Sequence, residues 1–182
     1  MNKFIALAAV SAAALAATPA AAAPSGPRVE ALVGWDQARV DLGADDFKEE
    51  GVLYGVGVGY DFALANGAAL GVDLEASDST AKESNIAGSL SAKRDLYAGG
   101  RVSIPIDEKN SNVYLKAGYT NARFTVSDNV VSISDNLDGY RLGAGAQFSL
   151  NGKAYVGGEY RYSNYENDVS RHQLALTVGT RF

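Results

Sequence analysis

The chain has 182 residues, with 16 Lys and Arg against 21 Asp and Glu, a net charge of −5 and no cysteine. The acidic balance argues against a nucleic-acid binder, which would carry a clustered basic surface. The lack of cysteine excludes disulfides, thiolate metal sites and a lipidated N-terminal cysteine. The length suffices for one domain, and no linker or second domain is evident.

The first 22 residues have the pattern of a secretory signal peptide. Lys3 gives a positive start, residues 4–17 are apolar and rich in alanine, and small residues follow at cleavage spacing. The apolar stretch is short for a retained membrane-spanning helix, which is the alternative. We therefore expect a signal peptide over residues 1–22, cleavage after Ala22, and one domain over residues 23–182.

Apolar and polar residues alternate with a period of two along most of the remaining chain. In residues 52–62 every even position is apolar or aromatic, whereas the odd positions include three glycines and an aspartate. Strict alternation over this length indicates a strand with two different faces. The pattern recurs in residues 28–36, 70–77, 95–104, 113–120, 140–148, 154–162 and 173–182. We therefore expect eight strands.

The connections between these segments alternate in length. Asn66-Gly67, residues 107–111 and Asn151-Gly152 predict short turns, because Asn and Gly tolerate positive φ. The other four connections are longer and polar, at residues 41–51, 78–89, 127–138 and 163–171. Short turns at one end and long loops at the other are typical of outer-membrane barrels. We therefore place both barrel termini in the periplasm and the long, acidic loops outside.

The placement of the apolar face separates a membrane barrel from a soluble eight-stranded barrel. Glycine is frequent on the polar face, where it suits a narrow lumen crowded with side chains. The apolar-face aromatic residues gather at strand ends, as the two interfaces of a bilayer require. We expect Tyr60, Phe62, Phe148 and Phe182 at the periplasmic rim, and Trp35, Tyr54, Tyr119, Tyr140, Tyr160 and Tyr162 towards the outer rim.

Residues 177–182 alternate and end on Phe182. They resemble the C-terminal signal that the barrel-assembly machinery reads, in which Val178 and Phe182 would take part. Together with the alternation, they make residues 29–182 similar to the small outer-membrane β-barrel superfamily, which includes the OmpA membrane domain, OmpX, OmpW and the opacity-type surface antigens. The resemblance implies an all-β fold, an eight-stranded antiparallel transmembrane up-and-down β-barrel that is monomeric. Because nothing follows Phe182, we expect no peptidoglycan-binding domain.

The lumen face of this barrel is expected to hold a nearly neutral charge network. Its members are Glu30, Asp73, Glu75, Asp95, Arg101, Lys116, Arg141, Glu159, Arg161 and Arg181. Asp73, Arg101 and Lys116 are expected at similar heights, as are Arg141, Glu159 and Arg161. Eight strands leave room mainly for side chains, so a polar plug is favoured over the alternative, a narrow gated ion path.

Three arginines interrupt the apolar face near the outer ends of strands. Arg39, Arg94 and Arg123 could pair with lipopolysaccharide phosphates, because arginine binds phosphate in a bidentate manner. The alternative is that they lie in solvated loop bases. The expected partners are therefore outer-membrane lipid and lipopolysaccharide, with the barrel-assembly machinery during biogenesis and no nucleic acid.

A catalytic site would have to use the single histidine, His172, with Ser170 and Glu166 nearby. The order Ser-Arg-His differs from the His-x-Ser arrangement of the lipid A deacylases, and we expect no enzyme, no cofactor and no metal. The leading interpretation is a structural or surface-antigen barrel. A narrow porin comes second, and an outer-leaflet lipid A-modifying enzyme is a distant third.

Overall fold

The computed structural model describes residues 25–41, 46–80, 82–85, 88–127, 132–166 and 169–182. The expected signal peptide, with its cleavage after Ala22, lies outside these residues. Within them, no helix is long and apolar enough to cross a membrane.

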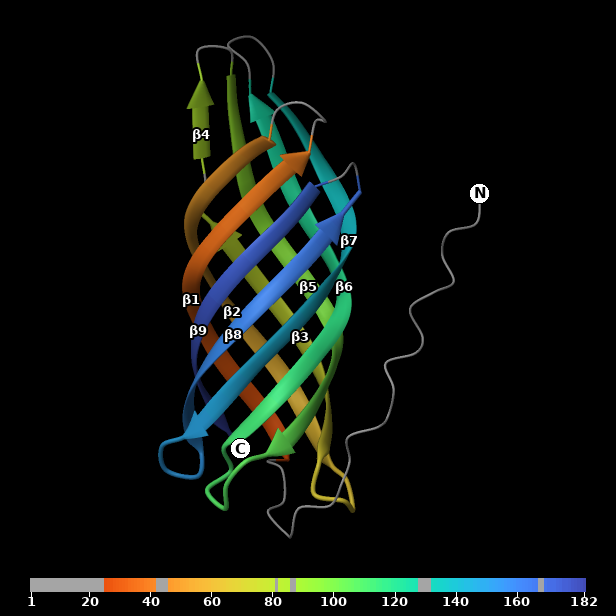
Figure 1. Ribbon diagram of the computed structural model, residues 1–182, viewed down its shortest axis with the longest axis vertical. Coiled ribbons are helices and arrows are strands. Elements are labelled where there is room, and N and C mark those ends of the chain that lie inside the picture. The colour runs from red at the N-terminus through yellow and green to blue at the C-terminus, as the bar shows by residue number, and fades with distance from the viewer. Residues whose placement is uncertain (1–24, 42–45, 81, 86–87, 128–131, 167–168) are drawn as a thin grey trace, which may run out of the picture.

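The described residues form a closed antiparallel barrel (Figure 1). Its strands are β1 (Gly26–Asp41), β2 (Asp46–Ala63), β3 (Ala69–Ser79), β4 (Lys82–Asn85), β5 (Gly88–Pro105), β6 (Asn112–Ser127), β7 (Ser132–Ser149), β8 (Ala154–Tyr165) and β9 (Val169–Arg181). The sheet order is β3-β2-β1-β9-β8-β7-β6-β5, and pairing of β3 with β5 closes the ring. Since β4 pairs with β5 beyond the end of β3, the wall has eight strands, and the expected fold class is confirmed.

The apolar face of each of the eight wall strands points outwards wherever its burial is described. In β3, Leu70, Val72 and Leu74 are exposed, whereas Asp73 and Glu75, which alternate with them, are buried. The most exposed side chains of the wall include Leu176, at 66 %. A soluble barrel would bury these residues and expose the charged ones, so the arrangement is that of a barrel with lipid around it.

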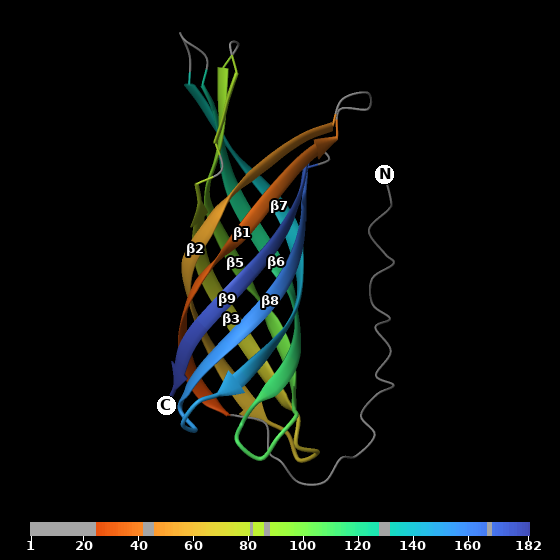
Figure 2. The same cartoon turned by 60° about the vertical axis from the view of Figure 1, so that its left-hand side comes forward.

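The four connections that the sequence predicts to be long are shorter than expected, and the bounds predicted for them were wrong. Pairing of β1 with β2 continues to Asp41 and Asp46, and pairing of β6 with β7 continues to Ser127 and Ser132. Backbone hydrogen bonding extends a hairpin even where both faces of its strands meet water, so the hydrophobic pattern fades before the strands end. In Figure 2, β4 to β7 rise above the rest of the rim.

The short turns lie at the opposite end, where β1 begins and β9 ends (Figure 1). Gly67 and Gly152 have φ of 84° and 80°, which explains the two Asn-Gly pairs. In the third turn, hydrogen bonds from the Ser111 hydroxyl and from the backbone N–H groups of Ser111 and Lys109 lower the pKa of the Asp107 carboxyl. The periplasmic location of this end stays a prediction.

Candidate functional site

The lumen holds a dense set of charged side chains. The ten residues that the sequence places there are all buried, none of them more than 6 % exposed: Glu30, Asp73, Glu75, Asp95, Arg101, Lys116, Arg141, Glu159, Arg161 and Arg181. Four further charged residues share the lumen, namely Arg28, Asp36, Asp61 and Arg171. The described lumen therefore contains seven acids and seven bases, and its formal charge is balanced.

Glycines on the same face make room for these side chains. A Cβ atom at Gly59 would lie 2.5 Å from Nη2 of Arg28, and one at Gly143 would lie 2.9 Å from Cγ of Lys116. Both distances are far below van der Waals contact. Glycines on the polar face thus leave the space that the long side chains of the lumen occupy.

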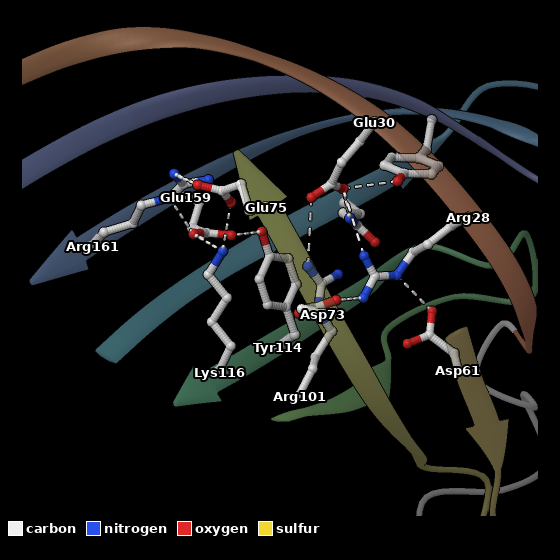
Figure 3. Close-up of polar contacts among 12 residues, drawn as sticks. Arg28, Glu30, Asp61, Asp73, Glu75, Arg101, Tyr114, Lys116, Glu159 and Arg161 are labelled. Carbon is white, nitrogen blue, oxygen red and sulfur yellow. Dashed lines mark hydrogen bonds and ion pairs between the residues drawn. The ribbon is translucent and has the colours of Figure 1, made fainter. Parts of the chain in front are cut away.

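The cluster nearest the start of β1 and the end of β9 centres on two arginines (Figure 3). Arg28 contacts Asp73 and Asp61, with Nε 3.0 Å from Asp61 Oδ2. Arg101 Nε lies 2.9 Å from the other oxygen of Asp73. Both guanidinium groups also lie 3.8 Å from Glu30. These contacts join β1, β2, β3 and β5 across the lumen.

The middle cluster is built around two glutamates (Figure 3). Lys116 Nζ lies 2.6 Å from Glu159 and 3.3 Å from Glu75. Arg161 contacts the same two carboxylates, at 2.5 Å and 2.6 Å. Arg141 also lies 3.3 Å from Glu75. Glu75 on β3 therefore holds three cations, from β6, β7 and β8.

A third cluster, towards the end of the barrel opposite the short turns, continues from Arg141, which also contacts Asp95. Asp95 accepts a hydrogen bond from Thr120 at 2.6 Å and lies 3.2 Å from Arg171. Arg171 in turn contacts both carboxylate oxygens of Asp36. Because Arg141 and Arg171 are each shared between acids, the ion pairs form a continuous path from the middle of the lumen towards the end opposite the short turns.

Residues that are expected at the same height in the lumen are in contact in only some cases. Asp73 is paired with Arg101, but Lys116, which lies directly opposite Arg101 in the ladder, turns to Glu75 and Glu159. The two like charges separate because each finds a carboxylate on a different side of the lumen. Arg161 pairs with Glu159, whereas Arg141 pairs with Glu75 and Asp95.

Tyrosines are further lumen residues outside the set predicted from the sequence. Their hydroxyls donate to lumen carboxylates: Tyr114 to Glu159 at 2.6 Å, Tyr155 to Glu30 at 2.8 Å and Tyr165 to Asp95 at 2.9 Å. The Arg101 guanidinium lies 3.9 Å from the ring centre of Tyr114, a cation–π contact that links the first two clusters. The alternation did place Tyr97, Tyr114 and Tyr155 on the polar face.

Removing the Tyr114 hydroxyl is expected to destabilise the barrel by about 1.5–3 kcal/mol, the usual contribution of a hydrogen bond to a charged group. The measurement is urea unfolding of Tyr114→Phe in lipid vesicles, followed by fluorescence of Trp35, the single tryptophan. Tyr97→Phe is the matched control, because the buried Tyr97 hydroxyl has no hydrogen-bond partner among the described residues. Equal losses in the two variants would contradict the assigned bond.

Comparison with known proteins places this arrangement in a family. A family model described as the outer membrane protein beta-barrel domain matches residues 4–182. The chain belongs to this family. It is therefore an outer-membrane β-barrel protein. A search of the curated proteins gives no match.

Solved structures of three bacterial barrels are similar to this outer-membrane barrel. Neisserial surface protein A has a TM-score of 0.62 and 18 % identity, covering 87 % of this chain and 98 % of its own. Ail, the attachment invasion locus protein of Yersinia pestis, has a TM-score of 0.59 and 19 % identity, covering 87 % and 100 %. OprG of Pseudomonas aeruginosa has a TM-score of 0.53 and 11 % identity, covering 88 % and 98 %. At these identities the likeness shows the fold alone.

The residues predicted to bind lipopolysaccharide or to take part in assembly lie on the outside of this outer-membrane barrel. Arg94 and Arg123 are exposed, and Arg39 is half-buried, with an Nε that has no hydrogen-bond partner in the described part of the chain. Val178 and Phe182 are 56 % and 71 % exposed. Their roles in binding lipopolysaccharide and in assembly stay predictions.

The lone histidine also faces outwards, among aromatic residues of the wall. His172 Nδ1 lies 2.7 Å from the Tyr160 hydroxyl, and its ring centre lies 5.1 Å from that of Tyr162. Among the described contacts, none joins His172 to Ser170 or Glu166. The described residues also contain no group of three or more His, Cys, Asp or Glu side chains able to hold a metal ion.

Proposed function

We propose that this outer-membrane barrel is a closed structural protein of the envelope that presents its outer hairpins at the cell surface. The observation that carries the proposal is the charge network, in which seven acids and seven bases are buried in one lumen. Side chains that are paired across the lumen occupy the space that a solute would need. They also fix strand register, because each carboxylate has its partners on particular strands.

The cost of opening such a network supports a non-conducting state. Separating Arg141 from Glu75 and Asp95 would leave charges unpaired in a narrow lumen, and breaking a buried pair typically costs about 3–5 kcal/mol. A path through the middle cluster would require several such separations together. The plug therefore stays closed at thermal energies.

The remaining parts of the proposal concern the envelope around the barrel. Residues 1–22 are removed on export, residues 23–182 form the barrel, and Val178 and Phe182 are read by the barrel-assembly machinery. Both barrel termini face the periplasm, so the long hairpins face outwards. Lipid and lipopolysaccharide surround a monomer, and Arg39, Arg94 and Arg123 contact their phosphates.

Planar-bilayer conductance tests the closed lumen. We expect no discrete openings for the wild type, and none for Arg101→Ala or Arg141→Ala, because the remaining charged and aromatic side chains still fill the lumen. A heat-modifiability gel on each sample checks that a folded, SDS-resistant barrel was inserted. Openings in the wild type would overturn the proposal. Openings confined to the two variants would make the network a gate.

A narrow porin is the second candidate, and one observation favours it. Several buried polar atoms have no partner among the described residues, including Ser77 Oγ, Tyr97 Oη and Thr177 Oγ1. Such groups are normally satisfied by ordered water, and a file of water is what a narrow ion path needs. The same conductance recordings distinguish a hydrated plug from a path.

We propose no enzymatic activity. A hydrolase of the outer leaflet needs a base that is in contact with a nucleophile, whereas the described contacts of His172 are with two tyrosines. Deacylation of lipid A by the purified protein, abolished in His172→Ala, would overturn this part of the proposal.

A further inference from the structure

The outward wall carries an open, mostly apolar groove over β2, β3, β5 and β6. Its outward-facing lining is Val56, Val58, Leu74, Ala76, Leu96, Ala98, Tyr119 and Asn121. The groove has a volume of about 560 Å³. This volume lies within the range of small-molecule sites, about 300–1,000 Å³.

Strand register explains why the wall is hollow here. One row across the strands runs Val56, Ala76, Leu96 and Asn121, and the next runs Val58, Leu74, Ala98 and Tyr119. Ala76 and Ala98 are therefore diagonal neighbours, each beside a leucine. Two short side chains between longer ones make a depression, since the backbone there is covered only by methyl groups.

Two arginines lie at the outer end of this depression. Arg94 precedes Leu96 by two residues on β5, and Arg123 follows Asn121 by two residues on β6, so both keep the outward face. The ladder pairs Asp95 with Ala122 and then Ala92 with Phe124, so a β-bulge at Lys93 and Arg94 lies opposite Arg123 and brings the two arginines to about the same height. Both side chains are exposed. The apolar groove thus ends beside a pair of guanidinium groups.

Two acids lie near these arginines. Asp138 accepts hydrogen bonds from Tyr119 and from Asn121 Nδ2, and Asp78 accepts one from the Ser79 N–H group at 2.7 Å. In each carboxylate the described donors reach Oδ1. For Arg94 and Arg123, the described residues supply no ion pair.

We infer that this groove binds one anionic, phosphate-bearing lipid, with an acyl chain against Ala76 and Ala98 and the phosphate against Arg94 and Arg123. Arginine forms paired, charge-assisted hydrogen bonds to phosphate, and the groove ends beside the two guanidinium groups. A second copy of the barrel fits less well. Two copies in one membrane share their orientation, so a two-fold contact at this wall would place arginine against arginine. The inference rests on the proposed contact of Arg94 and Arg123 with lipid phosphate, but it does not depend on whether the lumen conducts.

Native mass spectrometry of the full chain in a neutral detergent tests the site. The probes are phosphatidylglycerol, lipid A and, as a lipid without net charge, phosphatidylcholine. We expect one retained phosphatidylglycerol or lipid A, and about tenfold weaker retention of either by Arg94→Gln/Arg123→Gln. Loss of a hydrogen bond to a charged group corresponds to roughly this factor. Ala76→Leu/Ala98→Leu, which fills the groove, should weaken retention to a similar degree.

Two controls match these variants. Lys109→Gln/Lys153→Gln removes the same charge from exposed residues in turns at the other end of the barrel, and Ala31→Leu enlarges an exposed alanine on β1. Both should retain lipid like the wild type, and heat-modifiability gels confirm folding of every variant. Equal weakening in test and control variants would overturn the inference. So would phosphatidylcholine retention equal to that of phosphatidylglycerol, or a dimer in place of a lipid complex.

Discussion

Glu75→Gln is expected to destabilise the barrel by about 3–5 kcal/mol, the typical cost of removing one partner from a buried ion pair. Glu75 is 6 % exposed and is shared by Lys116, Arg141 and Arg161. Glutamine keeps the shape of the side chain but not its charge. The three cations would then share only Glu159 and Asp95, so repulsion among the bases adds to the lost attraction.

The measurement is again urea unfolding in lipid vesicles with Trp35 fluorescence. Glu108→Gln is the matched control, because Glu108 is exposed in the turn between β5 and β6. A change there should alter stability by less than about 1 kcal/mol, as for surface ion pairs in general. If Glu75→Gln were as stable as the control, the middle cluster would not hold the strands together.

A second outcome of the same experiment concerns the state of the lumen. Loss of the Glu75 charge leaves the middle cluster cationic, and anions would then be attracted into it if water could reach it. Steeper recovery of stability with added salt in Glu75→Gln than in wild type would indicate a hydrated lumen. No salt effect would indicate that the plug excludes mobile ions.

The fold could be predicted from the sequence because one property, the period-two pattern, determines both the strands and their faces. The alternation of apolar and polar positions alone predicts that Arg101 and Glu159 face the lumen, and both side chains are buried. In a lipid-surrounded barrel the two faces differ more than in a soluble sheet. The polarity of each strand residue therefore indicates whether its side chain faces the lumen or the lipid.

The ends of the strands could not be predicted in this way. Arg171 was placed in a polar loop, yet β9 begins at Val169, and Arg171 is a lumen residue bound to Asp36. Near the outer rim, both faces of a strand meet polar surroundings. The alternation of apolar and polar residues therefore no longer indicates which way a side chain points, although backbone pairing continues.

The partners within the lumen also depend on geometry that a strand pattern does not contain. Glu75 and Arg161 are 86 residues apart and meet across the barrel. Their contact depends on the tilt and stagger of the strands, which the alternation of apolar and polar residues does not determine. The groove between Ala76 and Ala98 has the same origin, since only the register makes those two alanines diagonal neighbours.

Adjacent glycines on β5 provide the sharpest test of how tightly the lumen is filled. A Cβ atom at Gly99, which faces inwards, would overlap the Tyr97 hydroxyl and lie 2.5 Å from the Ala117 carbonyl oxygen. At Gly100, which faces outwards, the nearest such atom is the Gly71 carbonyl oxygen at 3.8 Å. The two positions share strand, depth and residue type, and differ only in direction.

Gly99→Ala is therefore expected to destabilise the barrel by about 1–3 kcal/mol, the usual cost of overpacking. Gly100→Ala should be neutral or stabilising by about 0.4–1 kcal/mol, because alanine restricts the unfolded chain. Urea unfolding of both variants gives the difference directly. The Tyr97 ring can move away from a new methyl group, but the carbonyl oxygen of Ala117 belongs to the neighbouring strand and cannot move without disturbing the ladder. Equal stability of the two variants would mean that the lumen has free space beside β5, which a closed plug does not allow.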